Sequence, residues 1–476
     1  MAFKYQHLTK ELRDKINHNW WAAGERLPSI RQLCQSYQAS LATVRHALAE
    51  LEAQGYLEAR DRSGYFVRAR QRRVPVTADL SPLPGQPQPT AVTLPDLLYD
   101  IMQRSAAFDF YPRGPLVQLP QLKTLQQLQT KVTKQLGAAP ALQYEEPFGA
   151  LELRQQLATS YQSHGLTLDA PDLYLTAGCQ HALFLALHAI CSPGDIVVVE
   201  QPGFYGVLQL LQQLQLQVIE VPTDHAGMDI SALELVVARW RIKACIVSPS
   251  FGTPSGQLMP EERKQRLVEL ANSNDFALIE DDIYGDLGFY QRPTPLKALD
   301  TENRVVLCSS LSKSLSRDLR IGWIAPARWS QQIGRLKLTS QLAGSQGNAI
   351  AVARFIAEGH YRRHLQQFRT LLIHHHNQLH QALQQLFLQD PQVQQLGSID
   401  WNSPHGGLSL WLKLPPAIDA LQLYNRGLNQ GLVLTPGALF TASDQFKNYL
   451  RVPFVNPVAG PRLDALQQLK QLILAV

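Results

Sequence analysis

The sequence predicts a large α/β domain with a mainly parallel sheet, preceded by a small module of helices and one hairpin. From about residue 108 onward, short apolar runs alternate with helical stretches of ten or more residues. Runs that are apolar throughout suit strands buried on both faces, as in a parallel sheet. A Pro-rich stretch and a change in charge set this region apart from the first 73 residues. We therefore expect two separate domains.

Length and composition exclude several classes of protein. With 476 residues, 45% hydrophobic and 17% charged, the chain can bury a large core and is too long for one small domain. No apolar run reaches the about 18 residues of a membrane helix, and the N-terminus lacks the apolar core of a secretion signal. We expect a cytoplasmic protein with no membrane partner. Its cysteines form no C-x-x-C pair and suit a reducing compartment: Cys34, Cys179, Cys191, Cys245 and Cys308.

The positive charge is concentrated at the front of the chain. Residues 1–73 carry 13 Lys and Arg against 7 Asp and Glu, whereas the net charge of the whole chain is only +5. A basic module beside a nearly neutral region indicates a nucleic-acid-binding domain joined to another domain. A solvated basic face is the alternative interpretation of the charge alone.

Three helices followed by a hairpin are predicted for the basic module. The first helix runs roughly from Tyr5 to Asn17. Ser29 is placed to cap the second helix, which ends near Tyr37, and Ser40 caps the third helix, Leu41–Gln54. The hairpin strands, Tyr56–Ala59 and Gly64–Arg68, enclose a basic tip that can reach phosphates.

The third helix has the pattern of a helix that enters the major groove of DNA. Its apolar residues recur at helical spacing, which leaves another face for polar side chains. The apolar residues are Val44, Leu48 and Leu51, and the other face carries Thr43, Arg45 and His46.

Three segments of the module resemble the winged helix-turn-helix of GntR-type bacterial regulators. They are Arg26–Leu33 (RLPSIRQL), Thr43–Leu57 and Ser63–Val67, and they cover nearly the whole module. The resemblance implies that double-stranded DNA is contacted by the counterparts of Arg31, Ser40, Thr43, Arg45 and Gly64. The helix face and the basic hairpin tip add His46 and Arg62 to these candidates. A winged helix used only for protein contacts is the alternative.

A linker is predicted between the two domains. Val74–Pro95 is dense in proline and lacks apolar periodicity. Prolines favour an extended, semi-rigid backbone, so this stretch would hold two domains apart. The predicted boundaries are 1–73 for the DNA-binding domain, 74–107 for the linker and 108–476 for the large domain.

The large domain contains several predicted buried strands and Leu-rich helices. The strands include Ile196–Val199, Ala244–Val247, Ala277–Ile279 and Val305–Leu307. The Gln- and Leu-rich pieces Leu122–Leu136 and Gln378–Leu388 have leucines at helical spacing and are predicted as amphipathic helices. No metal site is expected at His374–His376, because adjacent residues of a helix point in different directions.

Lys313 is a candidate for covalent chemistry. It lies in Ser309–Leu315, directly after a predicted strand, and Arg320 follows seven residues later. A lysine among hydroxyls and near an arginine can form an imine with an aldehyde whose phosphate those groups hold. Taken alone, the segment is better explained as an exposed loop that carries a lysine.

Other polar and aromatic residues also follow predicted strands, where ligands bind in parallel sheets. Asp281 follows Phe276–Glu280 and can keep a pyridine nitrogen protonated, while the Tyr284 hydroxyl can bond the ring's phenolic oxygen. The backbone at a helix start can seat a phosphate: Gly178, Cys179 and Gln180. Phe204 can stack on a cofactor ring, although aromatic residues after strands more often belong to the core.

Together these segments resemble the fold-type I pyridoxal-phosphate enzymes, the aminotransferase superfamily, over about residues 108–476. Tyr144–Arg154 matches an early signature of that family, and Pro249–Gly256 takes the place of its N-P-T-G loop. The resemblance implies a mainly parallel sheet, a smaller C-terminal α+β part and pyridoxal 5'-phosphate as cofactor.

The same resemblance implies a role for each matching residue. Lys313 would be the Schiff-base lysine, Asp281 the partner of the ring nitrogen and Tyr284 that of the phenolic oxygen. Arg451 matches an arginine that clamps the carboxylate of an amino compound, with a surface ion pair as the alternative. Thr253 replaces an asparagine that bonds the ring oxygen, so catalytic tuning would be relaxed. The phosphate would be held by Gly178, Gln180, Ser310, Ser312 and Arg320.

The order of the two domains resembles the MocR-type subfamily of GntR regulators. That resemblance implies a head-to-tail homodimer whose DNA binding responds to imine exchange at Lys313. Pyridoxal phosphate itself, a small amino acid or an amine would suit such a pocket as effector. Two alternatives stay open: a working aminotransferase with an appended DNA-binding module, and a DNA-binding scaffold whose pocket is vestigial.

Overall fold

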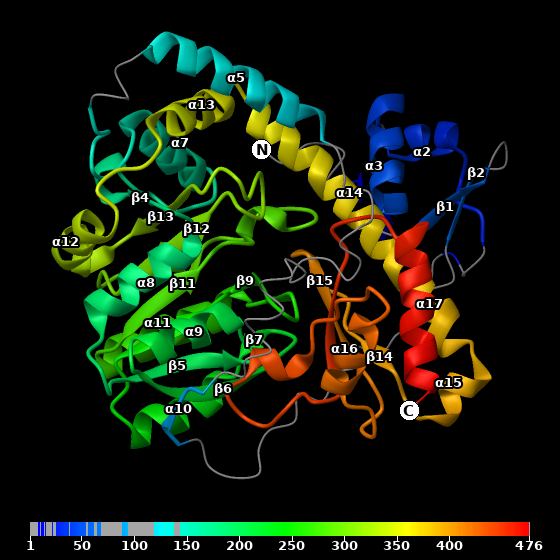
Figure 1. Ribbon diagram of the computed structural model, residues 1–476. Coiled ribbons are helices and arrows are strands. Elements are labelled where there is room, and N and C mark those ends of the chain that lie inside the picture. The colour runs from blue at the N-terminus through cyan, green and yellow to red at the C-terminus, as the bar shows by residue number, and fades with distance from the viewer. Residues whose placement is uncertain are drawn as a thin grey trace. The chain divides into compact units, whose positions relative to one another are not determined.

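A computed structural model divides the chain into two compact units, Met1–Val76 and Thr77–Val476 (Figure 1). The structure describes residues 8–9, 11–13, 15, 21, 25–37, 39–53, 56–60, 64–67, 88–93, 119–137 and 143–475. The predicted first helix falls only partly within these residues, and those of its residues that are described are helical. The predicted hairpin tip at Arg62 lies outside them.

The small unit contains two fully bounded helices and a hairpin. Ser29 is the N-cap residue of helix α2 (Ile30–Ser36), as the sequence predicted, and it also forms a capping box with Gln32. Helix α3 (Leu41–Ala53) follows, and the Ser40 hydroxyl accepts a hydrogen bond from the Thr43 N–H at 3.2 Å. Strands β1 (Leu57–Arg60) and β2 (Gly64–Val67) then pair antiparallel.

One apolar core holds the elements of the small unit together. Val44, Leu48 and Leu51 of α3 are fully buried, as their spacing predicted. They pack with Leu33 of α2 and Leu57 of β1. The hairpin therefore lies against the same core as the helices, which is the winged arrangement.

A nine-stranded sheet forms the centre of the large unit. Along the sheet the order is β3-β6-β5-β8-β11-β12-β13-β4, and β7 pairs with β6. The five strands from β6 to β12 run parallel, whereas the outer pairings are antiparallel. The bounds are β3 Thr90–Ala91, β4 Tyr174–Thr176, β5 Ile196–Gln201, β6 Gln217–Asp224, β7 Gly227–Met228, β8 Ala244–Val247, β11 Ala277–Asp281, β12 Val305–Ser310 and β13 Gly322–Ala325. The mainly parallel sheet is confirmed.

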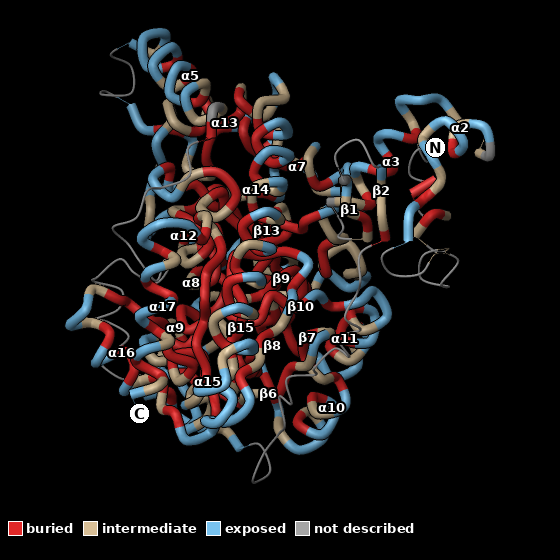
Figure 2. Tube along the Cα trace, turned by 90° about the vertical axis from the view of Figure 1, so that its right-hand side faces the viewer, coloured by how far each residue is buried: buried red, intermediate tan, exposed pale blue. Residues whose placement is uncertain are grey.

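Helices cover both faces of this sheet. Val197 and Val199 of β5 pack in the cluster that includes α8 (Cys179–Ile190) and α9 (Tyr205–Gln213). Val198 between them faces the opposite cluster, with α10 (Ile230–Arg239) and α11 (Glu261–Asn274). The central strands are thus buried on both sides (Figure 2), which explains why they are apolar throughout.

The rest of the large unit consists of a helical layer and a smaller C-terminal part. A three-stranded antiparallel sheet in the latter has the order β14-β15-β16. Its strands are Asp400–Trp401, Ser409–Lys413 and Tyr449–Pro453, and its helices are α15 Pro391–Gln395, α16 Ala420–Leu428 and α17 Pro461–Leu474. The other helices are α5 Pro120–Leu136, α7 Leu151–Gln162, α12 Ser330–Ser340, α13 Gln346–Ala357 and the 24-residue α14 His360–Leu383. The short strands β9 and β10 are Ser250–Gly252 and Gln257–Leu258.

The structure differs from the prediction at the start of the large unit. Thr90 and Ala91, inside the segment expected to be linker, form β3 and pair with Val218 and Gln217 of β6. Val92 next to them is buried in the main core. A two-residue edge strand is too short to produce an apolar periodicity, so the Pro-rich composition hid it.

Candidate functional site

The candidate site lies where β11 and β12 end. Asp281 is the last residue of β11 and is in register with Cys308 of β12. Strand β12 ends at Ser310, and Lys313 lies in the turn that follows it. Because the two strands are parallel, their carboxyl ends meet at one edge of the sheet.

Lys313 is surrounded by groups that disfavour its charged form. Burial lowers the pKa of its ε-amino group well below the usual value, and the cations of Arg317 and Arg451 lower it further. The Asp281 carboxylate opposes this effect only in part. This environment favours the neutral amine, the form that attacks an aldehyde.

Asp281 is buried, and one of its oxygens is held by two donors. The Cys179 thiol and the Ile283 N–H each lie 3.2 Å from Asp281 Oδ1. Burial raises the pKa of Asp281 to about 6, so the carboxylate is mostly ionised at neutral pH. Burial also raises the pKa of Cys179 well above its usual value, which keeps the thiol protonated as a donor. Asp281 thus presents a fixed anion to a cationic partner.

Gly178 and Arg320 form an anion seat at the start of α8. Gly178 is the N-cap residue with φ of 97°, and no side chain caps this helix. Arg320 Nη2 donates to Ala177 O at 2.8 Å and would lie 2.8 Å from a Cβ at position 178. Glycine is therefore required by both the backbone angle and the guanidinium. Backbone N–H groups, a helix dipole and an exposed arginine together suit a phosphate.

Polar and aromatic groups surround the seat. Gln180 Nε2 donates to Gly206 O at 2.7 Å, and the ring of Phe204 packs over the same glycine. Ser310 Oγ accepts from the Ser312 N–H at 3.2 Å, which fixes the turn before Lys313. In the described part of the chain, the buried Ser312 Oγ has no hydrogen-bond partner.

Tyr284 and Thr253 lie next to each other. Burial raises the pKa of Tyr284, and the Thr253 hydroxyl and Arg451 are among the groups that act on it. Thr253 Oγ1 is itself buried, and the described residues offer it no hydrogen-bond partner. Thr253 therefore lies close enough to act on the Tyr284 hydroxyl, while its own hydroxyl stays available to a ligand.

Arg451 is buried in β16 and is not part of a surface ion pair. Its side chain lies over the ring of Phe440, 5.6 Å from the centroid. Among the described residues, neither Nε nor Nη2 has a hydrogen-bond partner. These two nitrogens form the edge of a guanidinium that binds a carboxylate bidentately. The surface-pair alternative is thus wrong for this arginine.

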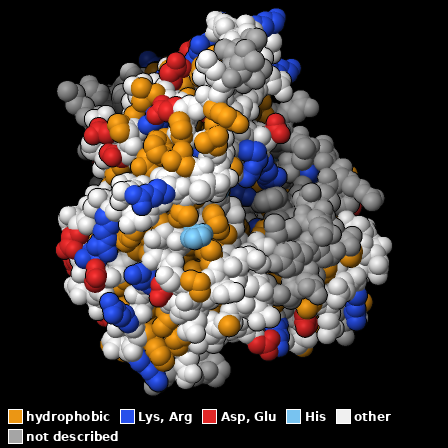
Figure 3. All heavy atoms as spheres, turned by 60° about the vertical axis from the view of Figure 1, so that its left-hand side comes forward, with side chains coloured by type: hydrophobic (Ala, Val, Ile, Leu, Met, Phe, Trp, Pro, Cys, Tyr) orange, Lys and Arg blue, Asp and Glu red, His pale blue; other side chains and the backbone are white. Residues whose placement is uncertain are grey.

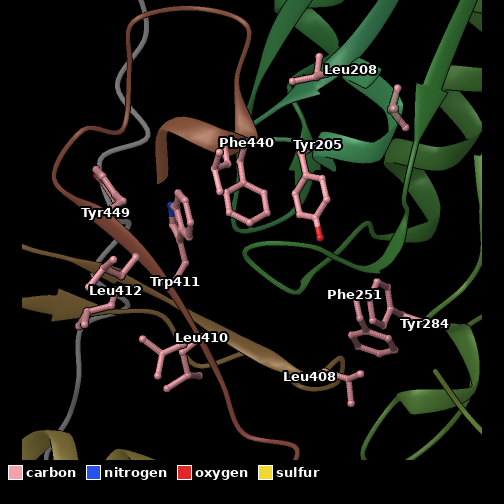
Figure 4. Packing of buried hydrophobic residues seen from close by; sticks show 14 of the residues in the cluster. Tyr205, Leu208, Phe251, Tyr284, Leu408, Leu410, Trp411, Leu412, Phe440 and Tyr449 are labelled. Atoms are coloured by element: carbon pink, nitrogen blue, oxygen red, sulfur yellow. The ribbon is translucent and has the colours of Figure 1, made fainter. Parts of the chain in front are cut away.

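Aromatic side chains line the wall next to Arg451. Phe440 packs edge-on against Tyr205 and Trp411, with centroids 5.6 and 5.4 Å apart. The Tyr205 hydroxyl points away from Phe440, on the side where Tyr284 lies (Figure 4). Such a wall excludes water from the space that the charged groups face.

The residues present fit pyridoxal phosphate. The unpartnered hydroxyls of Ser312 and Thr253 match a phosphate and a ring oxygen, and the Gly178 backbone leaves room for the former. Asp281 suits the ring nitrogen and Lys313 suits the aldehyde. When bound, the cofactor supplies an electron sink and an electrophilic carbon, while the protein holds and orients it.

Sequence reasoning missed two groups at the site. Arg317 is exposed, yet its charge acts on Lys313 more strongly than that of Arg451. Its place between Lys313 and Arg320 was a visible signal. Tyr205 was passed over in favour of the adjacent Phe204, because the sequence does not reveal which of two neighbouring aromatics faces a pocket.

The candidate DNA-contacting residues lie on the outer surface of the small unit. Arg31, Arg45 and His46 are exposed, and Ser40 and Thr43 bond to each other at 2.8 Å at the start of α3. Gly64 opens β2 with φ of 99° and packs against Arg26. Arg62 falls outside the described residues.

The fold and the site define a pyridoxal-phosphate-dependent protein of fold type I joined to a winged helix-turn-helix. Family models agree: residues 119–458 match "Aminotransferase class I and II", and residues 4–67 match "Bacterial regulatory proteins, gntR family". The chain therefore belongs to the aminotransferase class I and II family, in the MocR-type arrangement in which a GntR-type DNA-binding domain comes first.

Relatives match this chain over most of their own length. The uncharacterized HTH-type transcriptional regulator YjiR of Escherichia coli is 33% identical over 99% of this chain and 98% of that protein. The HTH-type transcriptional regulator TauR of Rhodobacter capsulatus is 27% identical over 92% and 90%. The kynurenine aminotransferase of Pyrococcus horikoshii, solved with PMP, covers 80% of this chain and 94% of its own, with 26% identity and a TM-score of 0.71.

The chain is accordingly a pyridoxal-phosphate-dependent, DNA-binding transcription regulator. No described helix combines the length and the apolar character that a membrane crossing needs. Across the described residues, no three His, Cys, Asp or Glu side chains gather as a metal site would require. His375 instead lies close to Val455 O, at 3.0 Å from Nδ1.

The pKa of Asp281 predicts how cofactor affinity depends on pH. The affinity of the protein for pyridoxal phosphate should fall as pH drops through about 6, because protonated Asp281 no longer attracts a cationic ring nitrogen. Fluorescence titrations from about pH 5 to about pH 8 measure this dependence.

The phosphate of the cofactor titrates near the same pH, with a second pKa of about 6. The variant Asp281→Asn serves as control, because it keeps the phosphate contribution and lacks the carboxylate. Its affinity should be lower at neutral pH and less dependent on pH. An identical pH profile in both proteins would contradict the assignment of Asp281.

Proposed function

We propose that this regulator senses a small amino compound at the bound cofactor and changes its DNA binding in response. The proposal rests on the unpartnered, buried edge of the Arg451 guanidinium, which lies close to Lys313, whose pKa is lowered by burial and by nearby cations. One group suits the acid end of an effector, and the other suits the reaction with its amine. An α- or ω-amino acid has both ends.

The sensing reaction is an exchange of amines. With pyridoxal phosphate bound, Lys313 Nζ would hold the cofactor's aldehyde carbon, and the amine nitrogen of the effector would replace it there. The effector gives up two protons and Lys313 gains two, so no water, oxidant or reductant is consumed. The low pKa of Lys313 favours its release as a neutral amine.

The acid group of the effector is held by Arg451. A buried guanidinium that lacks a partner is costly, so an oxyanion that supplies one binds strongly and selectively. The aromatic wall at Phe440 and Tyr205 increases this effect by excluding water. An amine without an acid group would leave Arg451 unpaired and should bind more weakly.

DNA is read by α3 and the hairpin. Exposed Arg45 and His46 extend from a helix whose other face is buried. Arg45 is the candidate for a base-edge contact, since a planar guanidinium bonds guanine bidentately. Ser40 and Gly64 position the helix start and the hairpin next to phosphates. Such a regulator acts in the bacterial cytoplasm.

Replacement of Arg45 by alanine should abolish specific operator binding. Loss of a bidentate base contact and of one charge costs about 1–3 kcal/mol in base discrimination alone. A gel-shift titration against the promoter region of the regulator's own gene measures it. Arg266→Ala is the matched control, because it removes the same charge from an exposed ion pair in the large unit. Wild-type affinity in Arg45→Ala would refute the assignment.

The active assembly is proposed to be a head-to-tail homodimer. Tyr144 is 82% exposed, and Leu338 and Leu342 are 40% and 47% exposed at the end of α12. Lys337 joins these segments by donating to Pro147 O at 2.9 Å. Figure 3 turns this side of the large unit forward and shows apolar side chains gathered on it. The patch adjoins the phosphate seat, since His181 of α8 lies 3.0 Å from Ser340 Oγ.

Two charges on this patch should dissociate the dimer. The wild-type protein should sediment at twice the 53.3 kDa chain mass, and Leu338→Glu combined with Leu342→Glu should shift it toward the monomer. Leu235→Glu, at a leucine that is 74% exposed on α10, is the matched control and should stay dimeric. A dimer unaffected by the double substitution would place the interface elsewhere.

Lys313→Ala should eliminate the covalent bond between protein and cofactor. The wild-type protein treated with pyridoxal phosphate and borohydride should gain a stable adduct, and the variant should gain none. Operator affinity of the variant should no longer respond to amino acids. A reducible adduct in Lys313→Ala, or an operator occupancy that ignores the cofactor in the wild type, would disprove the mechanism.

Arg451→Ala separates cofactor binding from effector selection in the same experiment. This variant should keep the adduct at Lys313. The amino-acid concentration needed for the spectral response should rise by about tenfold or more. Its response to simple amines should change little, because these lack the acid group. Equal loss for amines and amino acids would show that Arg451 does not select the acid group.

A working aminotransferase is the second candidate function. The neutral Lys313 and the ionised Asp281 favour it, because both are needed for proton transfer at the cofactor. Steady turnover of an amino acid with a 2-oxo acid would support this function. A single, incomplete conversion would support sensing.

A further inference from the structure

A buried polar network lies behind Lys313 and Asp281, next to the residues that follow them in the chain. Ser314 follows Lys313, and Asp282 follows Asp281. Ser314 and Asp282 are both only 2% exposed. The network joins these two residues through helix α14, and none of its members belongs to the cofactor pocket as described above.

Helix α14 holds Ser314 from two positions one turn apart. Tyr361 Oη lies 2.8 Å from Ser314 Oγ and 2.7 Å from Asp286 Oδ2. A phenol has a single proton, so Tyr361 donates to the carboxylate and accepts from the serine hydroxyl. His364 Nε2 lies 2.8 Å from the Ser314 carbonyl oxygen and donates to it. Ser314 is thus fixed through both its side chain and its backbone.

Asp286 continues the network to the end of β11. Arg292 Nε lies 3.5 Å from Asp286 Oδ1, and the same guanidinium pairs with the carboxylate of Asp282. Tyr161 donates to Asp282 Oδ2 at 2.9 Å and accepts from Trp323 Nε1 at 3.1 Å. Asp282 is therefore held as firmly as Ser314.

His364 is neutral in this setting. Its side chain is fully buried, and burial lowers its pKa. The hydrogen bond to Ser314 O places the proton on Nε2, and no described residue bonds the buried Nδ1. The residue therefore works as a fixed donor of one hydrogen bond.

We propose that Tyr361 and His364 of α14 are positioning residues for Lys313. By holding Ser314, they fix the direction in which the Lys313 side chain leaves the backbone, relative to an Asp281 held through Asp282. This inference rests on the proposed function, because it concerns the same amine. It adds α14 as the element that sets the geometry of the covalent step.

The chemistry needs this support. Local hydrogen bonds close the turn that carries Lys313: the Ser312 N–H bonds to Ser310 Oγ, and the Leu315 and Ser316 N–H groups bond to Leu311 O. A nucleophile must approach its target within a narrow range of distance and angle, and supporting residues outside the pocket provide that order. The two bonds from α14 add a restraint on Ser314, the residue next to Lys313, so their loss should disturb the direction of the amine.

Tyr361→Phe tests the proposal, because it removes the hydroxyl and keeps the ring. The formation of the borohydride-reducible adduct with pyridoxal phosphate should slow by roughly tenfold. The pH midpoint of the visible absorbance band should also shift, since the environment of the imine nitrogen changes. Stopped-flow absorbance and a spectral pH titration of the full-length protein measure these effects.

Matched variants separate positioning from general damage. Tyr174→Phe removes a hydroxyl that lies 3.4 Å from Ser330 O and should behave as wild type. Ser314→Ala should reproduce the slow uptake from the other side of the bond, whereas Ser314→Thr keeps the hydroxyl and should restore most of the rate. If the two groups act through one bond, the double variant Ser314→Ala with Tyr361→Phe should form the adduct hardly more slowly than either single variant.

The outcomes distinguish this inference from the function on which it rests. Ser314→Ala carries the test alone if Tyr361→Phe does not fold, as judged by circular dichroism and thermal melting. Wild-type rates and midpoints in both folded variants would overturn the positioning role and leave the sensing proposal intact. A wild-type protein that forms no adduct would remove the basis of both.

Discussion

The site depends on the shared burial of an amine and a carboxylate at the adjoining ends of β11 and β12. Burial acts on the two groups in opposite directions, because it disfavours charge in both. It raises the pKa of Asp281 to about 6 and lowers that of Lys313. Near neutral pH this leaves an ionised acid beside an amine poised for attack. A parallel sheet, whose strand ends converge, brings about this combination without a special loop.

Close backbone approaches keep the rest of the pocket in place. A side chain at Gly322 of β13 would meet the Gly178 backbone at 2.5 Å, so the strand and the start of α8 touch directly. Arg320, two residues before Gly322, consequently reaches the carbonyl of Ala177. The anion seat therefore follows from sheet packing, whereas the orientation of Lys313 follows from the polar network under it. Apolar packing thus places the anion seat, and buried hydrogen bonds orient Lys313.

Sequence reasoning named the groups that the structure brings together at the candidate site and missed the polar groups that lie behind them. Lys313, Asp281 and Arg320 each follow a strand or lie at a fixed spacing, so local pattern was enough to identify them. Tyr361 lies 47 residues from Ser314 along the chain, and that separation carries no local signal. The same limit applies to β3, where two residues pair with a strand 128 positions away.

The departure at position 253 and the supporting network bear on the difference between sensing and turnover. Turnover requires that proton transfers be tuned at every step, whereas sensing requires only that an effector bind differently in two states. The two proposed anchors for an amino acid lie on different sheets: Lys313 follows the main sheet, and Arg451 belongs to the C-terminal one. The affinity of the protein for the amino acid therefore depends on the distance between these two sheets.

Any influence of DNA on that spacing must, by linkage, be matched by an influence of the amino acid on DNA binding. A threonine at position 253 that leaves the proton transfers untuned would not impair sensing. A displaced Lys313 would make the regulator insensitive to its effector, because the effector could then no longer be held at both ends. The proposed role of α14 is consistent with this requirement, since the helix that supports Ser314 also bonds, through His375, to the strand end beyond Arg451.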